Sequence, residues 1–215
     1  MSCHHEHNHD DDHIEPPSTV FANLFNYIDI PNIKILNAEE PENAVGIVRP
    51  NEEKLVQEPV LTTDADEELL ISIPFIGHVK LHSVFIRSLG DDTSPKEIKL
   101  YKNNVNLDFD TVGSAQCIQT LNYPESIGPG ITTSDGTDGI VQFAVNRPKF
   151  SNISSVTLHI TQNYGAEQTK LLYLGFRGDF TELKSAPVIA QYEAAANPSD
   201  HKVENRNMQQ QSSIN

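Results

Sequence analysis

The sequence predicts an all-β protein of the sandwich or jelly-roll type, and three observations support this prediction. Roughly seven to nine short runs alternate apolar and polar residues with a period of two, as half-buried strands do. Segments rich in Gly, Pro, Asn and Asp separate these runs and are typical of turns. Few windows show the helical period, and the clearest of them lies near the N-terminus. We therefore expect a jelly-roll β-sandwich with a short N-terminal helix and disordered tails.

The central element of this fold is expected to be a β-hairpin within residues 64–88. Residues 69–75 and 79–88 each alternate in the manner of a strand, and a short connection around Gly77 joins them. Four acids stand at the entrance of the first strand: Asp64, Asp66, Glu67 and Glu68. We interpret this run of charges as a solvated cap of the strand.

A second hairpin-like pair is expected to close the core. Its strands are residues 156–161 and 171–180, and the connection between them is polar and contains Gly165. Further strands are predicted at residues 44–48, 97–102 and 140–145, with a short edge strand at 107–110.

The N-terminal helix is predicted from the helical spacing of Val20, Phe21, Leu24 and Ile28, and Pro31 would end it. Residues 124–139 are rich in Gly, Pro, Ser, Thr and Asp, so we expect a long surface loop there. The chain then divides into three parts: a His- and Asp-rich tail at 1–17, one domain at 18–196, and a polar tail at 197–215. Both tails have the composition of disordered segments.

Charge and cysteine content narrow the class of protein. The 215 residues include 30 acids and 15 bases, a net charge of −15, which disfavours nucleic acid and anionic membrane as partners. The chain has two cysteines, Cys3 and Cys117, and no CxxC, which fits a reducing compartment and provides no dithiol redox motif. Its start has neither the basic nor the apolar region of a signal peptide. We expect a monomer in the cytoplasm and nucleus.

No motif of nucleotide or hydrolytic catalysis is present in the sequence. The phosphate loop GxxxxGK[ST], a GxGxxG after a strand and the nucleophile elbow GxSxG are all missing. The four acids of residues 64–68 could supply a general acid and base or a hard-cation site, but solvation of a strand end is the simpler interpretation. Cys117 has no base nearby in the sequence, so we interpret it as a buried, inert thiol. The three histidines of the predicted strands and turns are interpreted as surface or hydrogen-bonded groups: His78, His82 and His159. We therefore expect a protein that is not an enzyme and needs no cofactor.

The N-terminal tail is the one segment with metal-ligand chemistry. Four imidazoles lie close together there: His4, His5, His7 and His9. Imidazoles with neighbouring carboxylates can chelate Zn²⁺, Cu²⁺ or Ni²⁺, but no rigid frame sets a coordination geometry. Loose, adventitious binding is therefore the favoured interpretation.

Four segments together resemble the PITH domain, the proteasome-interacting domain found after a thioredoxin domain or alone. They are DADEELL at 64–70, KLYKN at 99–103, the stretch 156–183 with its NYGA and RG residues, and YEAAANPSDHKV at 192–203. The resemblance covers about residues 14–203, and the His-rich start is similar to that of stand-alone members. It implies a jelly roll of galactose-binding-like type and, as a partner, the regulatory particle of the 26S proteasome. Without a thioredoxin domain or a CxxC, the redox activity of the thioredoxin-like relatives does not carry over.

Under this hypothesis, polar and aromatic residues that the strands do not need for a core would bind the partner. The candidates are Asn163, Tyr164, Gly165, Arg177, Gly178, Asp179, Tyr192, Asn197, Asp200 and His201. Each has a structural alternative, since the glycines can permit a positive φ and Arg177 with Asp179 can cap a sheet edge. The function expected is a non-enzymatic adaptor of the proteasome. The alternative is a small-molecule or carbohydrate-binding β-sandwich, with the His-rich tail as a metal-binding appendage.

Overall fold

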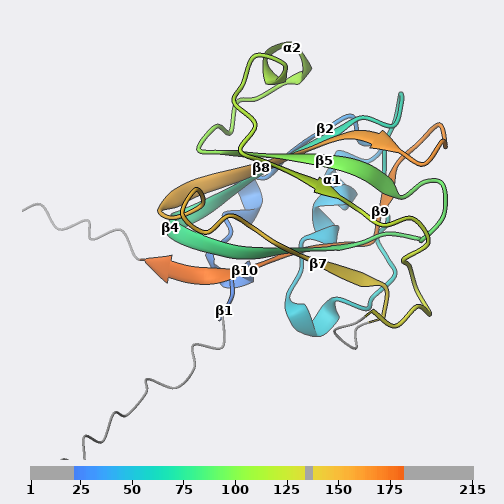
Figure 1. The fold of residues 1–215 in the computed structure, drawn as a ribbon, viewed down its shortest axis with the longest axis horizontal. Coiled ribbons are helices and arrows are strands. Elements are labelled where there is room, and N and C mark those ends of the chain that lie inside the picture. Colours follow the sequence, from blue (N-terminus) through green and yellow to red (C-terminus); the bar gives the residue numbers. More distant parts are fainter. Residues whose placement is uncertain (1–21, 134–137, 182–215) are drawn as a thin grey trace, which may run out of the picture. The chain divides into compact units, whose positions relative to one another are not determined.

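Strands dominate the computed structural model, which describes residues 22–133 and 138–181 (Figure 1). These residues belong to one unit of the chain, Met1–Leu183. Its strands are β1 (Ala22–Asn23), β2 (Lys34–Leu36), β3 (Leu61–Thr62), β4 (Leu69–Arg87), β5 (Pro95–Lys102), β6 (Gln119–Asn122), β7 (Ile140–Ala144), β8 (Ile153–Asn163), β9 (Lys170–Leu171) and β10 (Tyr173–Thr181). The helical elements are short: α1 (Pro41–Ala44), α2 (Phe109–Val112) and the 3₁₀ turns η1 (Phe25–Tyr27), η2 (Ile30–Asn32), η3 (Val45–Ile47) and η4 (Asn51–Glu53).

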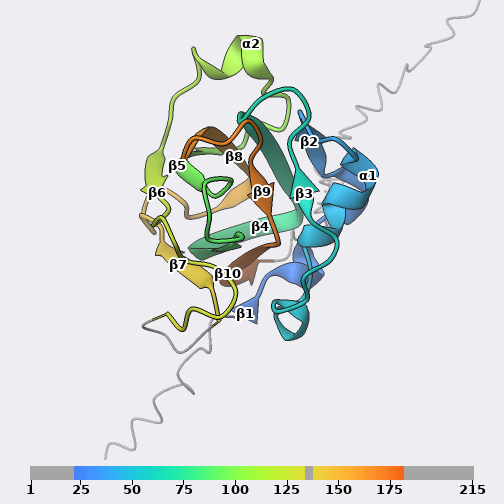
Figure 2. The same cartoon turned by 90° about the vertical axis from the view of Figure 1, so that its right-hand side faces the viewer.

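The long strand β4 belongs to both layers of the sandwich. Its first part pairs with β2 and β8, and β5 and β6 follow β8 at the edge. Its second part pairs with β10 and β7, and β1 adds to β10. All these pairings are antiparallel, and Figures 1 and 2 show the bend by which β4 passes from one layer to the other. The small pair β3–β9 lies outside this sheet.

The predicted hairpin at 69–88 is wrong, because the two runs form one continuous strand. The register of β4 against β8 shifts between Pro74 and Val79, so the strand bends there without reversing. Gly77, at the bend, does not have the positive φ of a tight hairpin turn. A Cβ at this position would lie 2.8 Å from the ring of Phe180, so the glycine permits close packing of β10.

The second predicted hairpin is also wrong. Strands β8 and β10 exist, but they lie on opposite sides of β4 and do not pair with each other. Hairpin pairing of sequential strands is a local rule, and here two long-range pairings with β4 override it.

Three shorter predictions are corrected by the structure. The N-terminal helix is replaced by β1 and the 3₁₀ turns η1 and η2, although Leu24 and Ile28 are buried as their spacing suggested. Residues 44–48 are the end of α1 and the turn η3, not a strand. At 107–110 the chain begins α2, because Asp108 and Thr111 form a reciprocal capping box. The strands predicted at 97–102 and 140–145 are confirmed as β5 and β7.

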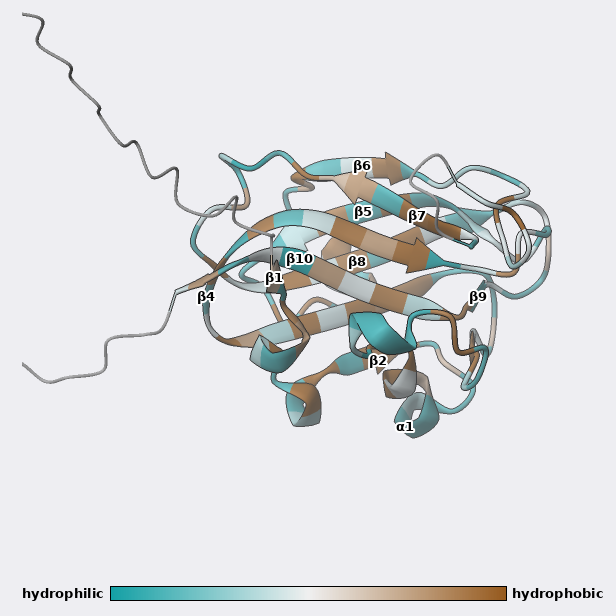
Figure 3. Ribbon diagram, turned by 90° about the horizontal axis from the view of Figure 1, so that it is seen from below, coloured by the Kyte–Doolittle hydropathy of each residue, from teal (hydrophilic) through white to brown (hydrophobic). Residues whose placement is uncertain are grey.

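The core lies between the layers and follows the alternation of the strands. Figure 3 shows apolar and polar residues alternating along β4 and β10. One large cluster contains the inward residues of both layers, and a smaller one, around Leu70 and Tyr101, lies beneath the α2 segment. Within the described ranges, no helix has the length and apolar character needed to cross a membrane.

Candidate functional site

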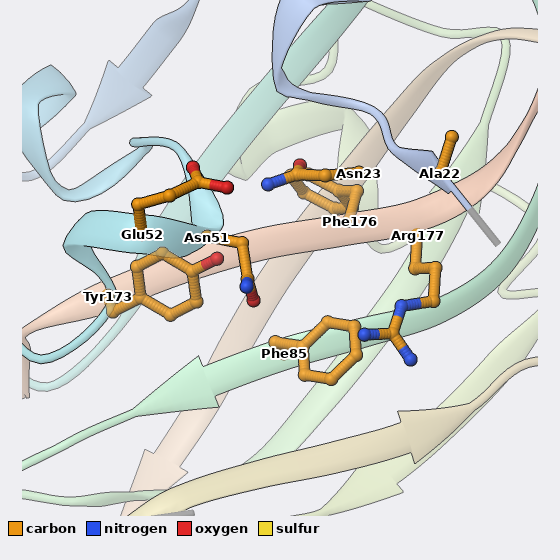
Figure 4. Close-up of a pocket in the computed structure, with 8 residues that line it drawn as sticks. All are labelled: Ala22, Asn23, Asn51, Glu52, Phe85, Tyr173, Phe176 and Arg177. Atoms are coloured by element: carbon orange, nitrogen blue, oxygen red, sulfur yellow. The ribbon is translucent and has the colours of Figure 1, made fainter. Parts of the chain in front are cut away.

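A cavity of about 180 Å³ opens on the outer side of β10 and β4. Figure 4 shows the eight residues that line it, from four elements distant in sequence. They are Ala22 and Asn23 of β1, Asn51 and Glu52 of η4, Phe85 of β4, and Tyr173, Phe176 and Arg177 of β10.

The register of β10 against β4 brings the guanidinium of Arg177 close to the ring of Phe85 in the cavity. Gly175 stands opposite Phe85, and Arg177 stands opposite Ser83, so alternate residues of β10 and β4 share one face. The guanidinium carbon of Arg177 lies 5.0 Å from the centroid of the Phe85 ring. This cation–π contact holds the guanidinium in place while its N–H groups remain available at the cavity.

Tyr173 supplies a buried hydroxyl to the same cavity. The residue is 2 % exposed, and burial, with the nearby charge of Glu52, raises the pKa of Tyr173 to about 12. The hydroxyl therefore stays protonated and can donate a hydrogen bond near neutral pH. Gly175 is required for this placement, because a Cβ there would collide with the Tyr173 hydroxyl.

The rim of the cavity is polar. Asn23 accepts the N–H of Phe25 with its Oδ1 at 3.0 Å, which leaves its amide N–H groups for other partners. Asn51 and the exposed Glu52 complete the rim on the side of η4. Arg177, Tyr173 and Asn23 thus bring hydrogen-bond donors, and Glu52 a carboxylate, to the lining of one small cavity. The described ranges contain no group of three or more His, Cys, Asp or Glu that could hold a metal ion.

An ionisable pair of one buried and one exposed side chain lies farther along the same strands. Nε2 of His82 is 3.3 Å from Oδ2 of Asp179. Burial lowers the pKa of His82, and the charges of Arg147 and Lys80 act in the same direction, whereas Asp179 opposes them. His82 and Asp179 thus join β4 to β10, two residues along β10 from the cavity residue Arg177.

The structure corrects three interpretations made from the sequence. His159, expected at the surface, is 5 % exposed, and its Nε2 lies 2.6 Å from Oε1 of Glu68. The acidic run is therefore more than a solvated cap, and Asp66 also accepts a hydrogen bond from the amide of Asn37 at 2.7 Å. Cys117, expected to be buried, is exposed.

The predicted partner-binding residues do not gather in one place. Arg177 lines the cavity, but Asn163 holds its own turn, since its amide donates to the carbonyls of Ala166 and Gln168 at 3.0 and 3.2 Å. Tyr164 donates its hydroxyl to the carbonyl of Tyr123 at 2.6 Å. Gly165 has a positive φ of 114°, Gly178 lies against the backbone carbonyl of Lys80, and Asp179 pairs with His82. The remaining eight predicted residues lie outside the described residues: Tyr192, Asn197, Asp200 and His201, and the metal candidates His4, His5, His7 and His9.

Sequence reasoning missed most of the cavity. The alternation of Tyr173, Gly175 and Arg177 was a visible signal that these residues share a face. Nothing local indicated that Phe85 or η4 would stand beside them, because those contacts depend on the pairing of β10 with β4.

Comparison with known proteins identifies the same family by its sequence model and by its relatives. Residues 15–196 match the PITH domain family. PITH domain-containing protein 1 of Mus musculus is 38% identical over 195 residues, covering 88% of this chain and 86% of that protein. The Homo sapiens protein of the same name is 36% identical over 192 residues, with the same coverage of each chain.

Among solved structures, the CBM32-1 and CBM32-2 domains of Clostridium perfringens ZmpB are similar with a TM-score of 0.50 and 12% identity. That match covers 71% of this chain and 35% of the other. At this identity the likeness concerns the fold alone, and it confirms the predicted jelly-roll sandwich of galactose-binding-like type.

Proposed function

The chain belongs to the PITH domain family, and from that premise we propose that it is a non-enzymatic adaptor that docks on the regulatory particle of the 26S proteasome. The observation that carries the proposal is the family match over residues 15–196, which spans the whole described sandwich. The proposal places the protein in the cytoplasm and nucleus, where proteasomes work.

The geometry of the Arg177 cavity supports a binding role. Arginine and aromatic residues are enriched at the centres of protein interfaces. Here Phe85 already orients the guanidinium, and the buried Tyr173 hydroxyl adds a fixed donor, so little side-chain ordering is needed on binding. A site of this kind recognises a polar group on a partner without transforming it.

The direct test uses the full-length chain immobilised on beads and incubated with three purified particles. These are the 26S proteasome, its regulatory particle and the 20S core. We expect retention of the first two and no retention of the core. Charge reversal in Arg177→Glu is expected to weaken retention about tenfold or more, because the loss of an interface arginine of this type costs more than about 1.4 kcal/mol.

The matched control is Lys149→Glu, a charge reversal at an exposed position in the turn between β7 and β8. It should leave retention unchanged, and both variants should melt at the temperature of the parent chain. Clean absence of regulatory-particle subunits from the parent beads would refute the adaptor proposal. Equal retention of the regulatory particle by both variants would instead show that Arg177 is not part of the binding surface.

A further inference from the structure

Residues 51–60, between the start of η4 and β3, form an exposed loop that we call the anchored loop. It carries three outward-facing aliphatic side chains: Leu55 at 49%, Val56 at 46% and Val60 at 37% exposure. Single exposed apolar residues are ordinary, but three within six positions of one loop form an apolar patch whose exposure to water is unfavourable.

One buried arginine holds the C-terminal half of this loop from beneath. Arg49 is 6% exposed, and its Nη1 donates to the carbonyl of Glu58 at 2.9 Å. Its Nη2 donates to the carbonyl of Leu172 at 2.7 Å and makes a longer contact of 3.4 Å with that of Pro59. The loop is thereby joined to the residue that precedes β10.

A second buried arginine holds the middle of the loop. Arg87, at the end of β4, is 1% exposed, and its Nη1 donates to the carbonyl of Leu55 at 2.9 Å. Asp138 pairs with the same guanidinium, with Oδ2 at 3.0 Å from Nη2 and the backbone carbonyl at 3.1 Å from Nε. Removing either guanidinium would leave partly buried carbonyls without their donors, so both contacts constrain the loop.

These two anchors determine how the aliphatic side chains are presented. The carbonyls of Leu55 and Glu58 point inward to the guanidinium groups, and the side chains of Leu55, Val56 and Val60 face solvent. A loop fixed in this way loses little further conformational entropy when a partner covers it. Exposed apolar groups on a preorganised backbone are a feature of protein-binding surfaces.

The exposed charges of the loop indicate the chemistry of the partner. Three carboxylates, Glu52, Glu53 and Glu58, accompany a single ammonium group, Lys54. Beneath them Asp138 offsets the charge of Arg87, and Glu53 interacts with that of Arg49, which leaves two carboxylates against Lys54. The chain as a whole carries −15, so its field attracts cations and repels phosphate surfaces.

We propose that the anchored loop is the docking surface for a segment of a partner protein in which aliphatic side chains lie between lysines or arginines. The aliphatic side chains would cover Leu55, Val56 and Val60, and the cations would meet Glu52 and Glu58. This inference rests on the proposed function only in taking the partner to be a protein of the regulatory particle. It adds which face of the sandwich binds and what the partner presents.

The first test needs no proteasome. The ¹⁵N-labelled full-length chain is titrated with a short peptide of alternating leucine and lysine and, in parallel, with the matching leucine–glutamate peptide. We expect the lysine peptide to shift the amide signals of residues 51–60, and the glutamate peptide to shift them at least tenfold less at equal concentration. Shifts confined to other parts of the chain, or equal shifts from both peptides, would overturn the proposal.

The second test compares Leu55→Ser/Val56→Ser with the control Ile76→Ser, which changes an aliphatic residue of 57% exposure on β4. Because all three positions are exposed, both proteins should retain the parent melting temperature. We expect the double variant to retain the regulatory particle about tenfold less than the parent chain, and the control to match the parent.

The two tests separate the inference from the proposed function. If the parent chain retains the regulatory particle and the double variant does so equally well, the docking surface lies elsewhere and the adaptor role stands. If the parent chain itself fails to retain the particle, the adaptor role fails, and the peptide titration alone decides whether the anchored loop binds basic, aliphatic segments.

Discussion

Individual polar side chains in this protein are buried against partners from distant parts of the chain. His159 of β8 meets Glu68 at the start of β4, and Oγ of Ser72 lies 3.0 Å from Oγ1 of Thr157. Such pairs satisfy polar groups that would otherwise destabilise the core. Their hydrogen bonds also select one register of β4 against β8, since a slip of one residue would separate them.

The lowered pKa of His82 predicts that the free energy of unfolding depends on pH. Burial lowers this pKa in the folded state below the ordinary value of 6.5, so the unfolded chain binds more protons as the pH falls. The contribution of His82 to the free energy of unfolding is therefore complete above about pH 6.5 and is lost as the pH falls toward the folded-state pKa. Urea unfolding of the parent chain and of His82→Gln, at about pH 8 and about pH 5, should show a smaller acid-induced loss in the variant. Equal losses in the two proteins would assign the acid sensitivity to other groups.

At the level of elements, β4 is the strand with which β2, β7, β8 and β10 all pair. One strand of 19 residues contributes to both layers, and its bend near Gly77 allows β10 to pack closely. Its last residue, Arg87, reaches beyond the sheet and holds two loops by their backbones, at Leu55 and Asp138. The binding surfaces proposed above are therefore held in place by contacts with β4 and β10, although their outermost residues lie in loops.

The substitution Arg87→Met tests this link between strand and loop. It removes the donors to the carbonyls of Leu55 and Asp138, and we expect it to destabilise the protein by about 2–4 kcal/mol. Limited trypsin digestion should then cut after Lys54 at least about tenfold faster than in the parent chain, because the loop opens more often.

Lys80→Met, at an exposed position of the same strand, is the control for this measurement and should leave cleavage after Lys54 unchanged. Slow cleavage in Arg87→Met would mean that Arg49 alone fixes the loop.

For the molecule as a whole, the galactose-binding-like fold does not by itself imply a sugar site. Functions differ widely among proteins of one fold, so the site has to be argued from its residues. The chain contains no tryptophan, and the face of Phe85 in the cavity is already covered by the guanidinium of Arg177. Stacking of a sugar ring on an aromatic platform is therefore blocked at this position.

We accordingly expect no stabilisation by simple sugars. Thermal unfolding of the full-length chain in about 10 mM galactose or N-acetylgalactosamine should match that in buffer, since a ligand that binds the folded state would raise the melting temperature. A rise that disappears in Arg177→Met would favour the carbohydrate-binding alternative over the adaptor.

The sequence by itself determined the fold class and the family resemblance, because these depend on local patterns and on the order of motifs. Alternation with a period of two identified β5, β7, β8 and β10, and the order of four segments identified the PITH domain. Only the tertiary structure decided that residues 69–87 form one strand, that β8 and β10 flank it, and that Arg177 lies over Phe85 in a cavity shared with η4. Local alternation says which face a residue occupies but not which strand lies beside it. Which strands and loops become neighbours depends on long-range strand pairing and on the hydrogen bonds that Arg49 and Arg87 donate to loop carbonyls. Neither produces a periodic pattern in the sequence.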